Sequence, residues 1–175
     1  MNRLAERLAQ GDSSAFADLY DACADQLHHY LTTRLGSRED ASDVLQEAFV
    51  RMARSRERFA GVEDPVAYAF VVARNESARH RQQAARTPVA RQASAEMLFA
   101  EARSDELERR ELAEFVAAAL ARLEDGLRDI VHLKIYAGLT FAKIAEVMEL
   151  PQGTVATRYR RAIQLLRTEF AKELM

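Results

Sequence analysis

The chain has 175 residues, of which 49% are hydrophobic and 30% are charged, and its formal net charge is −2. This hydrophobic content is enough to form folded cores, so it excludes a wholly disordered chain. A protein that holds DNA by itself usually has a clear positive excess, so any DNA contact is either small or made within a larger assembly.

The sequence lacks the motifs that mark several kinds of functional site. Cys23 is the only cysteine, which excludes a disulfide framework and a cysteine-based metal cluster. No apolar run approaches the length that crosses a bilayer, and residues 1–12 lack a signal-peptide core, so we expect a cytoplasmic protein without membrane insertion. The sequence has no phosphate-binding glycine loop and no catalytic motif, which predicts that the protein is not an enzyme and requires no cofactor.

The spacing of apolar residues predicts an all-α protein. The glycines fall between the periodic segments, as expected of turns that connect helices, and no segment alternates in the manner of a strand. We predict two small helical domains, at 1–81 and 106–175, joined by a linker over 82–105 in which Ala, Gln, Arg and Ser dominate.

The first predicted domain contains three main helices. The first begins near Asp12 and has an apolar stripe that includes Cys23, which predicts a buried thiol and not a nucleophile. Ser37 can cap the second helix, and Asp64 followed by Pro65 marks the start of the third. The third helix ends in a basic run, whose arginines include Arg74, Arg79 and Arg81.

Acidic side chains share the outer face of the predicted second helix, because Asp40, Asp43 and Glu47 are spaced at i, i+3 and i+7. This spacing fits a solvated surface and a protein-docking face equally well. His28 and His29 are adjacent, so their side chains should point apart on a helix, and we expect structural roles for them and not a metal site.

The most informative segment of the chain is 123–166, which reads as three helices separated by tight turns. Gly138 can end the first of them with a positive φ, and Thr140 can cap the second. Pro151 suits the start of the third. The third helix has an apolar stripe formed by Val155, Tyr159, Ala162, Ile163, Leu166 and Phe170.

The opposite side of that third helix is polar and basic. No acidic residue occurs from Leu150 to Thr168. Surface arginines can serve solubility alone, but their combination with a short helix and a tight turn favours a helix-turn-helix whose last helix enters the major groove of DNA. The side chains on this face are Thr154, Thr157, Arg161 and Gln164, flanked by Arg158 and Arg160.

Longer stretches of the sequence resemble one protein family. Residues 38–59, REDASDVLQEAFVRMARSRERF, and 64–81, DPVAYAFVVARNESARHR, resemble the polymerase-binding and promoter-melting region of bacterial sigma factors. Residues 138–167, GLTFAKIAEVMELPQGTVATRYRRAIQLLR, resemble the region of these factors that reads the upstream promoter element. With a short linker and no middle domain, the chain is similar to the compact extracytoplasmic-function (ECF) type.

This resemblance implies partners and site residues. The partners are core RNA polymerase, promoter DNA and, as for most family members, an anti-sigma factor. The segment 51–64 resembles the part that receives an unstacked base of the non-template strand. The positions that match the polymerase-docking helix are Asp40, Asp43, Gln46, Glu47 and Phe49. Those assigned to the −10 promoter element are Phe59, Arg74 and Asn75, together with Arg79 and Arg81 of the basic run. Those that match the helix reading the −35 element are Thr154, Val155, Thr157, Arg158 and Arg161.

The sequence also departs from the family pattern. The tryptophans that the family usually carries near Ala53 and Tyr68 are absent, and Arg79 stands where an acidic residue is common. Ala156 and Thr157 replace a common Lys-Ser pair. These departures leave open a sigma-like decoy that sequesters polymerase or a regulator without initiating transcription. A free-standing helix-turn-helix repressor, which binds duplex DNA tightly by itself, is a third interpretation.

Overall fold

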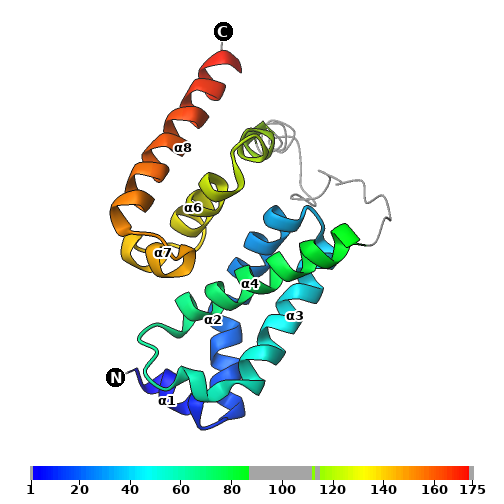
Figure 1. The fold of residues 1–175 in the computed structure, drawn as a ribbon, viewed down its shortest axis with the longest axis vertical. Coiled ribbons are helices and arrows are strands. Elements are labelled where there is room, and N and C mark those ends of the chain that lie inside the picture. Colours follow the sequence, from blue (N-terminus) through cyan, green and yellow to red (C-terminus); the bar gives the residue numbers. More distant parts are fainter. Residues whose placement is uncertain (1, 87–111, 113–114, 174–175) are drawn as a thin grey trace, which may run out of the picture.

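The structure is a computed structural model that describes residues 2–86, 112 and 115–173. All regular elements within these residues are helices, which confirms the predicted all-α fold. Figure 1 shows an N-terminal group of helices that contains α1 to α4 and, beside it, a C-terminal group that contains α6 to α8. Most of the predicted linker, from 87 to 105, lies outside the described residues.

Three long helices form most of the N-terminal group. Helices α2, α3 and α4 all pack against one another, while the short α1 contacts the 3-10 helix η1. Figure 1 shows α1 at the end of this group that is farthest from the C-terminus. The elements are α1 (Arg3–Ala9), α2 (Ser13–Leu35), α3 (Arg38–Arg54), η1 (Arg56–Phe59) and α4 (Pro65–Arg86).

A polar side chain caps one free backbone amide at the start of α3 and another at the start of α4. Ser37 Oγ accepts a hydrogen bond from the Asp40 amide at 3.2 Å, and the Asp64 carboxylate accepts one from the Ala67 amide at 3.0 Å. Gly36 ends α2 with a φ of 73°, a left-handed conformation that a Cβ disfavours. Side-chain caps such as those of Ser37 and Asp64 contribute about 1 kcal/mol each to helix stability. The predicted starts of α3 and α4 and the predicted end of α2 are therefore confirmed, and local chemistry accounts for them. The end of α4 is not as predicted, because this helix continues to Arg86, inside the stretch predicted as a linker.

The helix-turn-helix lies in the C-terminal group, which comprises α6 (Asp125–Ile135), α7 (Phe141–Met148) and α8 (Gln152–Glu173). Thr140 caps α7 as predicted, because its hydroxyl oxygen accepts a hydrogen bond from the Lys143 amide at 3.3 Å. Helix α7 packs against both α6 and α8. The short α7 therefore fixes the direction in which α8 leaves the domain (Figure 1).

The hydrophobic core continues from one group of helices into the other. Leu27, Leu31 and Phe70 are completely buried, and they belong to the same cluster as Ile130 and Ile144 of the C-terminal group. The contact between the groups is made by α2 against α6 and by α4 against α7. A second, smaller cluster holds α6 and α8 against the helical residues 115–121. The two groups of helices therefore share one hydrophobic core, and the C-terminal group has a second, smaller core of its own.

Candidate polymerase and nucleic-acid interfaces

The exposed face of α8 carries most of the residues that the sequence assigns to the −35 element. Thr157, Arg158 and Arg161 are exposed, and Thr154 is half-buried. Val155, by contrast, is completely buried in the hydrophobic core, because it lies on the apolar stripe of the helix. Val155 is therefore not part of the surface that can contact DNA. It belongs to the core beneath the other four residues assigned to the −35 element.

The basic face of α8 is not neutralised by any carboxylate of the described residues. Within the part of the chain that the structure describes, Arg158, Arg160, Arg161 and Arg167 take part in no ion pair. The Thr157 hydroxyl donates to the Gly153 carbonyl at 2.9 Å, so its oxygen can still accept a hydrogen bond. A helix face with free guanidinium groups at its surface attracts a polyanion, and the phosphates of DNA are the polyanion that fits a helix-turn-helix.

The −10 residues of α4 lie in two different surroundings. Asn75 and Arg79 are exposed at the surface. Arg81 pairs with Asp125 of α6 at 2.8 Å. Arg74 is half-buried, and its Nε has no hydrogen-bond partner among the residues that the structure describes. Asn75 is thus open to a ligand, whereas Arg81 is engaged by the C-terminal group.

A buried carboxylate organises the basic end of α4. The Glu76 side chain is only 6% exposed; its carboxylate forms an ion pair with Arg51, 2.6 Å from Nε, and accepts a hydrogen bond from Arg79 Nη1 at 2.8 Å. Two guanidinium groups balance the charge of this carboxylate, which makes its burial tolerable. Arg79 is consequently held in place by its i, i+3 neighbour.

The segment after α3 forms an aromatic cluster. The ring of Phe59 meets the rings of Phe16 and Tyr68 edge-on, with centroids 6.0 and 5.1 Å apart. Phe59 is completely buried, so it does not touch a ligand in this conformation. Its role in this conformation is to pack against Phe16 and Tyr68.

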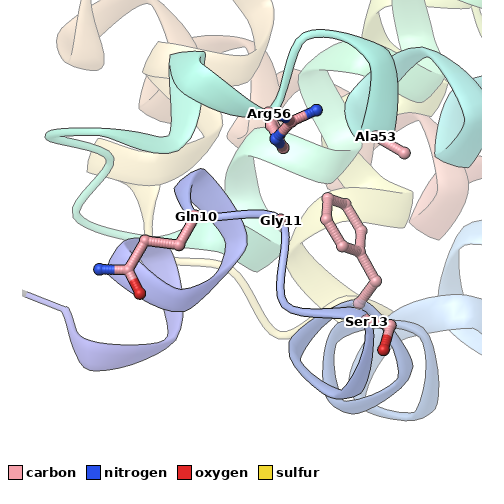
Figure 2. A pocket seen from close by; sticks show the side chains of 6 residues that line it. Gln10, Gly11, Ser13, Ala53 and Arg56 are labelled. Carbon is pink, nitrogen blue, oxygen red and sulfur yellow. The ribbon is translucent and has the colours of Figure 1, made fainter.

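An open hollow of about 420 Å³ lies beside this cluster. Figure 2 shows Ala53 and Arg56 on one side of it and Gln10, Gly11 and Ser13 on the other, and the Phe16 ring completes its lining. Gly11 has a φ of 80°, and a Cβ there would lie 2.9 Å from Arg56 Nε. The glycine therefore allows Arg56 to close over the turn between α1 and α2.

The acidic face of α3 is largely open to solvent. Asp43, Gln46 and Glu47 are exposed. Asp40 is different, because its carboxylate lies 3.3 Å from His80 Nε2 of α4 and is 14% exposed. Phe49 is half-buried and packs on Tyr20 with ring centroids 5.0 Å apart. Three polar residues and an aromatic pair thus form a surface that we call the α3 face: Asp43, Gln46, Glu47, Phe49 and Tyr20.

Sequence reasoning missed a polar cluster between the two groups of helices. Asp129 of α6 is buried and pairs with Arg34 of α2. His29 of α2 packs against His132 and Tyr136 of α6, with ring centroids 5.7 and 4.4 Å apart. Burial lowers the pKa of His132 to about 4, with smaller contributions from nearby positive charge. The sequence contained one sign of this cluster, namely that a carboxylate and an imidazole lie on an otherwise apolar face of α6.

The structure also bears on the remaining predictions for the cysteine, the histidines, metal binding and membrane insertion. Cys23 is buried as predicted, and burial raises its pKa to about 12. His28 and His29 point apart: His28 Nε2 lies 3.1 Å from Ser42 Oγ, whereas His29 faces α6. In the described ranges, no three acidic, histidine or cysteine side chains gather as metal ligands, and no helix is long and apolar enough to span a membrane.

Comparisons with known proteins agree with this arrangement. Residues 19–87 match the family model of Sigma-70 region 2, and residues 119–168 match that of Sigma-70, region 4. The chain is 30% identical to the ECF RNA polymerase sigma-E factor of Haemophilus influenzae over 173 residues, covering 93% of this chain and 91% of that protein. It is 25% identical to the ECF RNA polymerase sigma factor SigW of Bacillus subtilis, covering 94% and 93% of the two chains.

A solved structure shows the same architecture. The structure of CnrH in complex with the cytosolic domain of CnrY matches with a TM-score of 0.71 and 25% identity, covering 97% of this chain and 96% of that one. The match extends over both groups of helices and hence over the α3 face, α4 and α8 together. The chain belongs to the sigma-70 family and is a sigma factor of the ECF type, which directs RNA polymerase to promoters.

Proposed function

We propose that the surfaces described above divide the work of promoter recognition. Helix α8 reads the −35 element in the major groove, α4 and the neighbouring hollow meet the strand-separated −10 element, and the α3 face docks on core RNA polymerase. This division assigns polymerase and −10 binding to 1–81, a linker to 82–105 and −35 binding to 106–175. The observation that carries the proposal is the exposed face of α8, whose arginines have no acidic partner among the described residues.

The physical chemistry of each surface supports its role. An unstacked base requires an aromatic or apolar wall and a basic rim, and Phe16, Ala53 and Arg56 provide these in the hollow (Figure 2). An acidic face complements arginines on a partner protein. The net charge of −2 also fits, because core polymerase then supplies most of the affinity for DNA.

The chain does its work by binding and not by bond chemistry. Arginines that meet base edges contribute about 1–3 kcal/mol of discrimination each, whereas arginines that meet phosphates add salt-dependent affinity without sequence preference. We place this activity in the cytoplasm, where core polymerase and promoter DNA are found. We further propose a protein partner that restrains this chain, an anti-sigma factor, since the similar CnrH forms a complex with the cytosolic domain of CnrY.

Replacing Arg161 with alanine is expected to weaken transcription from −35-dependent promoters by about 5- to 100-fold, because one base-edge contact is lost. Core polymerase binding should not change, since Arg161 is on the exposed face of α8 and is not part of the α3 face. The measurement is in vitro transcription with core polymerase on promoters with intact and scrambled −35 elements.

Arg167→Ala is the matched control for that experiment, because Arg167 is also exposed and has no ion-pair partner in the described part of the chain, but it lies nearer the end of α8. We expect it to change the salt dependence of transcription without changing promoter preference. If Arg161→Ala keeps the full preference for the intact −35 element, Arg161 does not read bases.

Reversing the charge of the α3 face with Asp43→Lys and Glu47→Lys together is expected to weaken binding to core polymerase by at least about 10-fold, because like charges then face one another. Both residues are exposed, so the fold should tolerate the change. The measurement is a titration of labelled chain with core polymerase.

Glu57→Lys with Glu63→Lys makes the same change in net charge at another exposed part of the N-terminal group, and it should bind core polymerase nearly as well as the wild type. If both double variants bind core polymerase as tightly as the wild type does, the α3 face is a solvated surface and not a docking site.

The decoy alternative is tested by run-off transcription with purified core polymerase, in which a decoy yields no specific transcript.

A further inference from the structure

One buried carboxylate joins two arginines from different helices at the surface of the N-terminal group. Oε1 of Glu76 on α4 lies 2.6 Å from Nε of Arg51 on α3 and 2.8 Å from Nη1 of Arg79 on α4. The Glu76 side chain is 6% exposed, whereas those of Arg51 and Arg79 are 45% and 53% exposed. The acid therefore lies beneath the surface, and the two guanidinium groups are at the surface. We call these three residues the Glu76 cluster.

The direction of side chains on a helix explains how both arginines reach the same oxygen. A helical side chain leans toward the N-terminus of its helix, so Arg79 turns back onto Glu76, three residues before it. Helix α3 packs against α4, which brings the Arg51 side chain to the same acid from the neighbouring helix. One carboxylate thus fixes the relative positions of two cations that belong to different helices.

Each guanidinium group keeps donors for a second partner. A guanidinium has five N–H donors, of which Arg51 turns Nε and Arg79 turns one Nη1 hydrogen toward Glu76. Within the described ranges, neither side chain has another hydrogen bond or ion pair. One carboxylate cannot neutralise two guanidinium groups, so the Glu76 cluster keeps a net positive charge and suits an anion that accepts hydrogen bonds, such as a phosphate.

The Glu76 cluster lies beside the residue of α4 that is open to a ligand. Asn75 and Arg79 are four residues apart, so they share one side of α4, and both are exposed. The family commonly has an acidic residue at position 79, so the family pattern gives this arginine no role. A DNA strand that passes Asn75 meets a pair of cations whose positions are already set.

We infer that Glu76 is a positioning residue for the −10 strand: its buried carboxylate holds Arg51 and Arg79 as a pair of phosphate-binding side chains that spans α3 and α4. This inference rests on the proposed assignment of α4 to the −10 element. An arginine that is free in solution loses rotamer freedom when it binds a phosphate. An arginine that a carboxylate already holds has lost this freedom during folding, so it binds more tightly.

Magnitudes decide whether the acid helps or hinders binding. Holding one long side chain in place improves affinity by about 2- to 12-fold, and the Glu76 cluster holds two. The Glu76 charge repels a phosphate about 8 Å away, which costs about 4-fold in affinity at an effective dielectric constant of about 20 and physiological salt. The gain from positioning two arginines exceeds this repulsion, so the acid strengthens binding to a polyanion.

The test measures DNA binding by the holoenzyme, formed from the full chain and core polymerase. The probe is a promoter fragment with a mismatched, strand-separated −10 element and no −35 element. Glu76→Gln keeps the size of the side chain and removes its charge. Through charge alone, this variant would bind DNA more tightly than the wild type. Through loss of positioning it binds about 10-fold more weakly, which is the result we expect.

Glu76→Gln should not change the fold or the binding of core polymerase, because Arg51 and Arg79 are exposed and regain water when the acid is removed. Glu169→Gln is the matched control. Glu169 also pairs with two cations, Arg122 at 2.6 Å and Lys172 at 3.1 Å, but it belongs to the C-terminal group. This control should bind the fragment as tightly as the wild type.

A mutant cycle tests whether Glu76 acts through the two arginines. Arg51→Ala with Arg79→Ala should weaken binding by at least about 10-fold and lower the salt dependence of log K by about 0.7 for each lost phosphate contact. Adding Glu76→Gln to this double variant should weaken binding no further. Unchanged or tighter binding by Glu76→Gln alone, or an equal weakening in the chain without the two arginines, would overturn the inference.

Glu76→Asp decides the question if Glu76→Gln does not fold. This variant keeps the charge, but its side chain is one methylene group shorter and cannot hold both arginines, so binding should weaken by about 3-fold. Wild-type affinity would then refute positioning by Glu76.

Failure of the proposed function gives a different result. If Asn75→Ala, a scrambled −10 sequence and removal of both arginines all leave the affinity for the fragment unchanged, α4 does not meet the −10 element. If these changes weaken binding but Glu76→Gln does not, the assignment of α4 stands and only the positioning role is refuted.

Discussion

Replacing Phe70 with alanine is expected to lower the free energy of unfolding by about 3–5 kcal/mol. Phe70 is completely buried on α4, it belongs to the cluster shared by both groups of helices, and its ring meets Tyr30 with centroids 5.7 Å apart. The loss combines the transfer free energy of the ring with the cavity that it leaves. Urea unfolding followed by circular dichroism measures the change.

Tyr20→Ala is the matched control for the Phe70 variant. Tyr20 is 48% exposed and has one ring neighbour, Phe49, so its removal should cost about 1 kcal/mol or less. A Phe70 variant that loses no more stability than the Tyr20 variant would show that the shared core is not closely packed in solution.

Acidification is expected to destabilise the packed state through His132. Its pKa is about 4 in the folded chain, mainly because of burial, against a reference value of 6.5. The folded state therefore binds fewer protons than the unfolded state, so stability is complete above pH 6.5 and is lost as the pH falls toward 4. The loss by pH 5 is about 2 kcal/mol at one pKa unit per 1.36 kcal/mol. The surrounding groups that oppose its protonation are His29 and Arg128.

His132→Phe should remove this part of the pH dependence. Neither ring nitrogen of His132 has a hydrogen-bond partner within the described ranges, so an apolar ring leaves no polar group unsatisfied there. The measurement is the free energy of unfolding from pH 7.5 to 5 for the wild type and the variant, with His28→Gln as the control at the surface. Parallel curves for the wild type and His132→Phe would contradict the prediction.

Local features of this chain were readable from the sequence because they depend on neighbours a few residues away. The caps at Ser37 and Thr140 and the turn at Gly36 need only a side-chain oxygen or a missing Cβ at the right place. The same holds for the basic face of α8, since 3.6 residues per turn decide which side chains share a side. The fold class and the exposed arginines Arg158 and Arg161 followed from these local rules.

The sequence does not predict burial reliably for residues at the edge of an apolar stripe, because such residues could face either the core or the solvent. Val155 and Phe59 match contact positions of the family, yet both are completely buried. Whether a residue near the edge of an apolar stripe reaches the surface depends on the neighbouring helix that covers it, and spacing along one helix does not specify that neighbour. Asp40 shows the same effect, because the position of α4 brings His80 to 3.3 Å from its carboxylate.

The sequence by itself determined the helices, their ends and the chemical character of each face, since these are set within a few turns of one helix. Only the tertiary structure decided which faces meet. Arg34 and Asp129 are 95 residues apart in the chain, and His29 meets His132 across two helices. Such pairs form because the shared apolar core sets how α2, α4, α6 and α7 lie against one another, and that packing is a property of the whole chain.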